Sequence, residues 1–223
     1  MALSKRLLSI AKYIIGYKSL ADIACDHGYL GIYAAKNYNL EKVLLTDINE
    51  LPLASAKSNV VKNNLSNIIQ TKLGDGLVPL DEAYEVISIS GIGGILMKDI
   101  LSTGLTRAKE AKRLILCPNT DSYEVRKFLK DNNFIIEAEE IVHDYKYYEI
   151  IVARYVGQMI SYTEKELKYG PILLKEKSDE FINMYNNQLS LLVKQSFNIS
   201  LENAKETMNM KIKELEEILS KKM

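Results

Sequence analysis

Two acidic residues that follow short apolar runs are the first sign of chemistry in this chain. Asp22 lies in the run Leu20–Cys25, and Asp47 closes the run Val43–Asp47. In a strand–turn–helix–strand unit, the turn after the first strand lets backbone N–H groups approach a nucleotide, and an acid ending the second strand accepts hydrogen bonds from ribose hydroxyls. The spacing of the two acids is close to one βαβ crossover. We therefore expect both at one nucleotide site, although Asp47 is alternatively a helix N-cap.

The turn after Asp22 favours one kind of nucleotide over another. Ala24 and Asp26 stand where a dinucleotide fingerprint has glycine. A looser turn of small residues fits S-adenosylmethionine better, because that ligand has no pyrophosphate to be cradled against a helix N-terminus. From the first two turns we predict as cofactor-binding residues Asp22, Ala24, Cys25, Asp26, Gly28, Asp47 and Ile48.

Two glycine-containing loops follow later apolar runs. In a methyltransferase sheet the loop Gly74-Asp75-Gly76 reaches the adenine end, where Asp75 can accept from the exocyclic amine; a plain tight turn is the alternative. Gly91 and Gly93 lie in a loop where glycine allows close backbone approach, or where it serves helix packing. We assign Gly74, Asp75, Gly76 and Gly91 to the cofactor and Gly93 to the substrate.

Three polar side chains are the candidates for catalysis: Asp26, His27 and Asn119. Asn119 follows Pro118 at the end of an apolar run, where its amide can hydrogen-bond a base edge or simply make a turn. His27 is a candidate for the same base edge, with a solvated turn residue as the alternative. Nothing in the sequence predicts a metal site.

The elements that position these residues alternate along the chain. Candidate strands are Leu20–Cys25, Val43–Asp47, Ile68–Leu73, Val86–Ser90, Leu114–Cys117, Phe134–His143 and Tyr148–Arg154, and candidate helices are Tyr29–Tyr38, Leu51–Asn64, Gly94–Leu101 and Ser122–Asn132, with Asp121 as N-cap of the last. Five βα units predict an α/β fold with a mostly parallel, doubly wound sheet. The last two strands have no helix between them, so they predict a terminal β-hairpin. Rossmann-like methyltransferases end in this way, whereas dinucleotide-binding dehydrogenases usually continue with βα units.

The composition changes near Gly157, which divides the chain into residues 1–157 and 158–223. The second part has no strand signals and no arginine. Its apolar residues repeat at helical spacing in two sets, Leu174, Phe181, Tyr185, Leu189 and Leu192, then Leu201, Ala204, Met208, Ile212, Leu215 and Leu219. A polar break at Ser196–Ser200 predicts two antiparallel helices in a coiled-coil hairpin. Such a hairpin is either a stabilising or oligomerising appendage or an arm that grips a substrate.

The overall composition excludes some classes of protein. The chain has 223 residues, 47% hydrophobic and 26% charged, with 29 basic and 29 acidic residues. Zero net charge argues against a protein that coats nucleic acid through bulk charge, but allows a local basic face. Apolar stretches are shorter than the ~20 residues of a membrane span, and no signal peptide is evident. Two cysteines make no disulfide framework, so we expect a cytoplasmic protein.

The motifs together resemble the bacterial tRNA adenine-N1-methyltransferase family known as TrmK, which modifies adenine 22 in the D-arm. The core Asp-His-x-Tyr-Leu of its first motif is intact here as Asp26, His27, Tyr29 and Leu30, and Gly74–Leu77, Gly91–Gly94 and Pro118–Asn119 also match. The chain departs from that motif at Ala24, Cys25, Gly28 and Gly31. The resemblance implies a Rossmann-like fold, bound S-adenosylmethionine, a tRNA substrate and an RNA-contacting helical arm, for which Lys194, Lys205 and Lys211 are candidates. We expect a monomer.

The chemistry implied by this resemblance needs no base. Adenine N1 carries a lone pair, and its methylation makes the ring cationic, so a nearby carboxylate, here Asp26, would stabilise the transition state. Tyr29 is a candidate surface for a displaced base, and Lys5 and Arg6 can contact the cofactor carboxylate or RNA phosphate. The alternatives are a methyltransferase acting on another RNA position or a small molecule, and a cofactor-binding scaffold without turnover.

Overall fold

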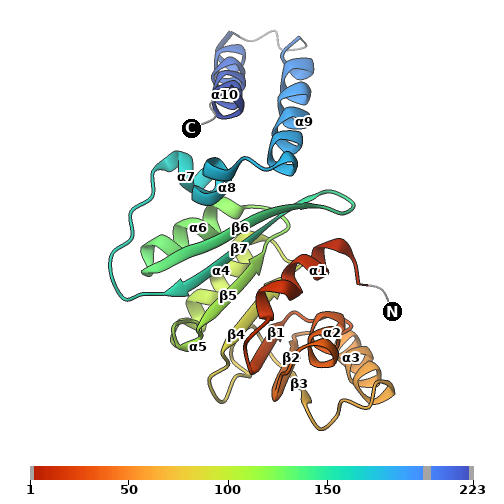
Figure 1. Cartoon of the computed structure of the whole chain (residues 1–223). Helices are drawn as coiled ribbons and strands as arrows, with labels where there is room; N and C mark the ends of the chain where they lie inside the picture. Colours follow the sequence, from red (N-terminus) through yellow and green to blue (C-terminus); the bar gives the residue numbers. More distant parts are fainter. Residues whose placement is uncertain (1–2, 198–201, 221–223) are drawn as a thin grey trace.

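The computed structural model describes residues 3–197 and 202–220. Within these residues a seven-stranded sheet has the order β3-β2-β1-β4-β5-β7-β6 (Figure 1). The strands are β1 Ser19–Ile23, β2 Lys42–Asp47, β3 Ile69–Leu73, β4 Val86–Ser90, β5 Arg113–Cys117, β6 Phe134–His143 and β7 Tyr147–Tyr155. Strands β1 to β5 are parallel, and the β6–β7 hairpin joins antiparallel to β5. The mostly parallel sheet and its terminal hairpin confirm the predicted fold class.

Helices cover both faces of the sheet, which explains why the central strands are mostly apolar and buried along nearly their whole length. Helices α1 Lys5–Ala11, α2 Tyr29–Asn37 and α3 Glu50–Lys62 pack on one face, and α4 Gly94–Thr103, α5 Leu105–Glu110 and α6 Ser122–Asp131 pack on the other. Successive residues of β1 enter opposite cores, since Leu20 packs with the first set and Ala21 with the second. A short 3-10 turn, Lys12–Ile14, extends α1.

In the described part of the chain, four helices follow the sheet: α7 Glu164–Tyr169, α8 Pro171–Glu176, α9 Asp179–Ser196 and α10 Glu202–Ser220. Helices α9 and α10 run side by side away from the sheet (Figure 1). At their base, Phe181, Tyr185, Leu215 and Ile218 are buried with residues of β6 and α8 in a third apolar cluster. The C-terminal helices are therefore packed onto the hairpin through α8.

A fully buried arginine joins this helical part to the sheet. Arg126 of α6 is 0% exposed, and its Nε donates to Glu139 Oε1 at 2.7 Å while Nη2 pairs with Glu149. The other oxygen of Glu139 accepts the N–H of Ile172 at 2.9 Å, in the first turn of α8. The carboxylate thus serves both the arginine and a helix N-terminus, whose free N–H groups favour negative charge.

Two local predictions were wrong. Asp121 precedes α6 with φ 59° and makes no capping hydrogen bond; its Oδ2 accepts instead from Thr120 Oγ1 at 2.7 Å. Leu174 belongs to α8, not to the long helix that contains Phe181, because Ser178 starts a new helix by accepting the N–H of Phe181. The predicted helix residue Leu201, and part of the break at Ser196–Ser200, lie outside the described residues.

Candidate functional site

A cavity of about 500 Å³ opens at the carboxyl ends of the parallel strands. Its walls come from α1, from the turns after β1, β2, β3 and β4, and from the start of α4. Strand β1 lies between β2 and β4, so the sheet is built outward from β1 in both directions. Open α/β sheets bind ligands at such a switch point, beyond the carboxyl ends of the strands.

The turn between β1 and α2 has a strained backbone where it borders the cavity. Ala24 and Asp26 have φ angles of 54° and 51°, in the left-handed region that favours glycine. A non-glycine residue there costs about 1–2 kcal/mol and persists only where other contacts hold it. Here Cys25 donates its N–H to the carbonyl of Thr46 at 3.0 Å, and Gly28 donates to the carbonyl of Cys25 at 2.8 Å. The turn is thus fixed against the end of β2.

Asp47 ends β2 as a buried acid that connects two turns. Its Oδ2 accepts the N–H of Asp26 at 3.2 Å, and its Oδ1 accepts the N–H of Asn49 at 2.9 Å. Asn49, not Asp47, is the N-cap residue of α3. Because a carboxylate has about four lone-pair positions, Asp47 can accept further hydrogen bonds from ligand hydroxyls.

A carboxyl and a guanidinium face the same cavity. Asp22 is 3% exposed, and this burial raises the pKa of its carboxyl group to about 7. A hydrogen bond from the N–H of Gly31 and the charge of Arg6 lower the pKa, but burial has the larger effect. Arg6 reaches the cavity from α1, and its buried Nη1 has no hydrogen-bond partner among the described residues. An unpaired guanidinium nitrogen beside a buried carboxyl suits a ligand group with both charges, such as an α-amino acid.

Asp26, His27 and Tyr29 lie together on the cavity wall. The Asp26 side chain is 69% exposed, and its Oδ1 is 3.5 Å from His27 Nε2. The other ring nitrogen of His27 is 2.7 Å from Ser55 Oγ, and the ring stacks on Tyr29 with 5.3 Å between centroids. A carboxylate next to two stacked rings can face a planar ring that becomes cationic.

The loops after β3 and β4 close the remaining sides. Asp75 is exposed on the cavity wall, and Gly91 lines it with φ 87°. Asn119 lies behind this second loop: its Nδ2 donates to the carbonyl of Gly91 at 2.5 Å and its N–H to that of Ile92 at 2.8 Å. Asn119 therefore positions the loop from outside the cavity.

The cavity brings together most of the residues that the sequence analysis selected: Arg6, Asp22, Ala24, Cys25, Asp26, His27, Tyr29, Asp47, Ile48, Gly74, Asp75, Gly76 and Gly91. Lys5, Gly28, Gly93 and Asn119 are not in its lining. Gly28 packs between β2 and α3, since a Cβ there would lie 2.7 Å from Leu45 Cδ1 and 3.2 Å from Ala56 Cβ. Lys5 borders a second cavity beside α9, and Gly93 is the N-cap residue of α4.

The sequence analysis missed an apolar part of the wall. Leu96 and Ile100 of α4 line the cavity, and Leu96 is half-exposed. Their spacing of four residues, directly after the glycine loop, places them on one face of α4, and that face lines the cavity. Asn49 and Pro52 join the wall at the start of α3, a helix that the sequence predicted without assigning these residues to the site.

Both cysteines of the chain lie in buried positions. Cys25 and Cys117 are free and buried, and burial raises the pKa of Cys25, so it stays a neutral thiol. Among residues 3–197 and 202–220, no cluster of His, Cys, Asp and Glu side chains could hold a metal ion, and no helix is long and apolar enough to cross a membrane.

Comparison with known proteins decides the family. The family model described as TrmK, tRNA (adenine(22)-N(1))-methyltransferase, matches residues 20–222. The chain belongs to the TrmK family. The tRNA (adenine(22)-N(1))-methyltransferase of Bacillus subtilis is 34% identical over 195 residues, which cover 85% of this chain and 82% of that protein.

Solved TrmK structures have the same architecture over nearly the whole chain. Sp1610 of Streptococcus pneumoniae, in complex with S-adenosyl-L-methionine, is 31% identical with a TM-score of 0.89, covering 98% of this chain and 100% of that one. TrmK of Mycoplasma capricolum, in complex with S-adenosyl-homocysteine, is 27% identical with a TM-score of 0.86, covering 98% of each chain. The resemblance drawn from the sequence motifs is confirmed.

Proposed function

We propose that this TrmK-family chain transfers a methyl group from S-adenosylmethionine to N1 of adenine 22 in tRNA. The observation that supports this proposal is the cavity at the switch point. Its lining contains Asp47 as a candidate ribose acceptor, Asp22 with Arg6 as a candidate site for an amino acid, and the exposed carboxylate of Asp26. Asp47 would bind the ribose hydroxyls, and Asp22 and Arg6 would bind the amino and carboxyl groups of the methionine part. Asp75 would accept from the adenine amine. When bound, S-adenosylmethionine supplies a methyl group on a positively charged sulfur.

The residues at the cavity mouth would then act on the target base. Adenine N1 is unprotonated and nucleophilic, so the protein has to position the base and stabilise the positive charge that develops on it. Asp26 supplies a carboxylate for that charge, and the stacked His27 and Tyr29 rings supply a surface beside it. Because N1 lies on the Watson–Crick edge, the adenine must leave its stack before it can react.

Asp26→Asn tests this role and leaves the backbone intact, since asparagine tolerates the left-handed conformation of residue 26. We expect the single-turnover rate of tRNA methylation to fall by about 10- to 100-fold, because the neutral amide cannot balance the charge on the base. The Kd for S-adenosylmethionine should change less than about threefold. A rate equal to that of the wild type would show that Asp26 has no electrostatic role.

The raised pKa of Asp22 predicts a pH-dependent cofactor affinity. Below pH ~7 the carboxyl is protonated in the free protein, and a cationic ligand group favours its ionised form. The Kd for S-adenosylmethionine should therefore fall about tenfold between roughly pH 6 and pH 8 as binding releases a proton. Calorimetry with Asp22→Asn is the control, because that variant keeps His27 and should lose the slope; equal slopes would contradict the prediction.

The activity itself is tested by radiolabelled S-adenosylmethionine with unmodified tRNA and a transcript in which adenine 22 is guanine. Label on the first alone supports both the activity and the position. Label on both retains a methyltransferase but rejects the position. Label on neither, with cofactor binding intact, favours a small-molecule substrate or a scaffold without turnover.

The helical part is the second proposed contact with tRNA, in the D-arm region. Lys194, Lys205 and Lys211 are exposed on α9 and α10, as an RNA-contacting arm requires. The division into residues 1–157 and 158–223, and the monomeric state, remain predictions. Sedimentation of the free protein measures the second of these.

A further inference from the structure

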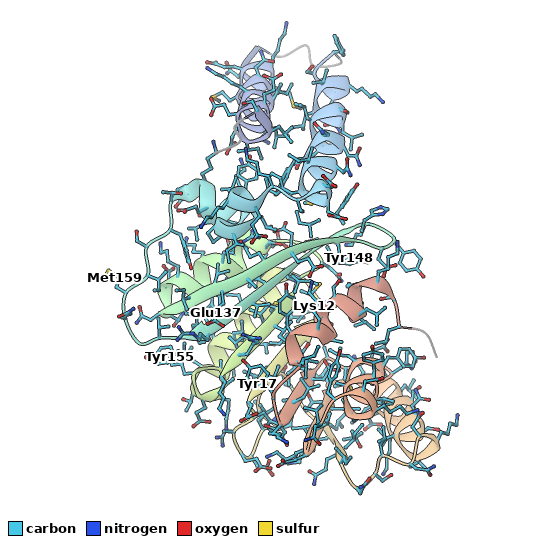
Figure 2. The ribbon with its side chains drawn as sticks, in the orientation of Figure 1. Lys12, Tyr17, Glu137, Tyr148, Tyr155 and Met159 are labelled. Atoms are coloured by element: carbon cyan, nitrogen blue, oxygen red, sulfur yellow. The ribbon has the colours of Figure 1, made fainter. Side chains whose placement is uncertain are left out.

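The tight turn between β6 and β7 exposes an aromatic side chain that the fold does not use. We call Asp144, Tyr145 and Lys146 the hairpin turn; its ends are joined by a hydrogen bond from the N–H of Asp144 to the carbonyl of Lys146, at 3.1 Å. Tyr145 is 91% exposed. The turn lies above the start of α1, where Figure 2 labels Tyr148.

Both neighbours of Tyr145 are attached to residues that build the cavity. Asp144 Oδ2 accepts the N–H of Arg6 at 3.4 Å, and Lys146 Nζ donates to the carbonyl of Asn119 at 3.1 Å. Arg6 lines the cavity, and Asn119 holds the Gly91 loop through its side-chain amide. Consecutive Cα atoms are ~3.8 Å apart, so the backbone of Tyr145 lies between two residues that are bonded to elements of the site.

Aromatic and cationic contacts reinforce this attachment. The Tyr148 ring has the Arg6 guanidinium 5.0 Å from its centroid and Lys146 Nζ 5.1 Å from it. The hairpin turn, α1 and the cavity wall are therefore connected in a continuous set of contacts. Tyr145 presents its ring to solvent, close in sequence to exposed Lys146 and His143.

We propose that the hairpin turn binds a tRNA nucleotide flanking the target adenine, with Tyr145 stacking on its base and Lys146 close to its phosphate. This inference rests on the proposed function. When the target base leaves its stack, the adjacent base loses a stacking partner. An aromatic side chain replaces that partner for any base, and a lysine beside it contacts the backbone.

The test compares Tyr145→Ala with Tyr145→Phe, which keeps the ring, and with Met159→Ala. Met159 is also 91% exposed, and Figure 2 shows it on the opposite side of the molecule from Tyr148. Tyr145→Ala should weaken tRNA binding, measured by filter retention of labelled tRNA, about tenfold and raise the KM for tRNA similarly. Its kcat and its Kd for S-adenosylmethionine should stay at the wild-type values, as should every constant of the other two variants.

Equal tRNA affinity in Tyr145→Ala and Tyr145→Phe would overturn the stacking role, and so would an equal loss in Met159→Ala. Filter retention measures tRNA binding without requiring methylation, so failure of this inference and failure of the proposed function can be distinguished. If the wild-type protein binds tRNA but does not methylate adenine 22, the proposed activity fails. The affinities of the Tyr145 variants still decide whether the hairpin turn contacts RNA.

Discussion

Asp47→Ala is expected to weaken S-adenosylmethionine binding by about 100-fold. The Asp47 carboxylate accepts the N–H groups of Asp26 and Asn49, and its remaining lone pairs face the ligand cavity. A hydrogen bond to a charged group contributes about 1.5–3 kcal/mol, and tenfold in Kd corresponds to about 1.4 kcal/mol. Two lost ribose contacts therefore account for about two orders of magnitude, and the loosened turn at Asp26 adds to the loss.

Calorimetric titration with S-adenosylmethionine measures this effect, and Asp75→Asn is the matched control. Asp75 lines the same cavity but is exposed, so its substitution should raise the Kd less than about fivefold. Thermal unfolding of Asp47→Ala without ligand shows whether the variant is folded. A folded Asp47→Ala protein with wild-type affinity would remove Asp47 from the cofactor site.

Arg126→Met is expected to lower the free energy of unfolding by about 3–5 kcal/mol. The substitution leaves the buried Glu139 and the largely buried Glu149 without their cationic partner. Burial already raises the pKa of Glu139, and Arg126 is the strongest influence that lowers it. Loss of the arginine should raise this pKa further. Urea unfolding measures the change in free energy.

Arg154→Met is the control, because Arg154 also pairs with a glutamate of β6 but in an exposed position. Its Nε is 2.5 Å from Glu137 Oε1, and the arginine side chain is 48% exposed. An exposed pair contributes about 0–1 kcal/mol, so Arg154→Met should be nearly neutral. Adding Glu139→Gln to Arg126→Met should recover part of the lost stability by removing one unpaired charge. Similar losses in the two single arginine variants would show that burial does not distinguish the pairs.

The central strands β1, β2, β4 and β5 were predictable because each is a short, mostly apolar run with a defined end. The end of β2 at Asp47 and the span of β6 agree with the sequence prediction, and the missing helix between β6 and β7 gave the hairpin. Helices α1, α5, α7 and α8 were not predicted. Each has six or seven residues, too few for an apolar period to appear, and tertiary packing stabilises them.

The candidate site was predictable where an acidic residue lies at or near the carboxyl end of a strand. Asp22 lies near the end of β1, Asp47 ends β2 and Asp75 follows β3, and all three line the cavity. The role of Asn119 was not predictable from the sequence. Its side-chain amide can donate to the carbonyl of Gly91 only because the pairing of β4 with β5 brings the two loops together. The left-handed conformations of Ala24 and Asp26 were equally hidden, because they depend on contacts with the end of β2.

The long sequence separation between α1 and the hairpin has a consequence for synthesis on the ribosome. The N–H partner of Arg6, Asp144, lies 138 positions later in the chain, and Glu140, the partner of Ser9, lies 131 positions after it. The turns after β1 to β4 are synthesised well before Asp144, so α1 can be fixed in the cavity wall through this contact only later. A nascent chain should therefore acquire cofactor affinity only after the hairpin has left the exit tunnel, which makes ligand binding a late marker of folding in this protein.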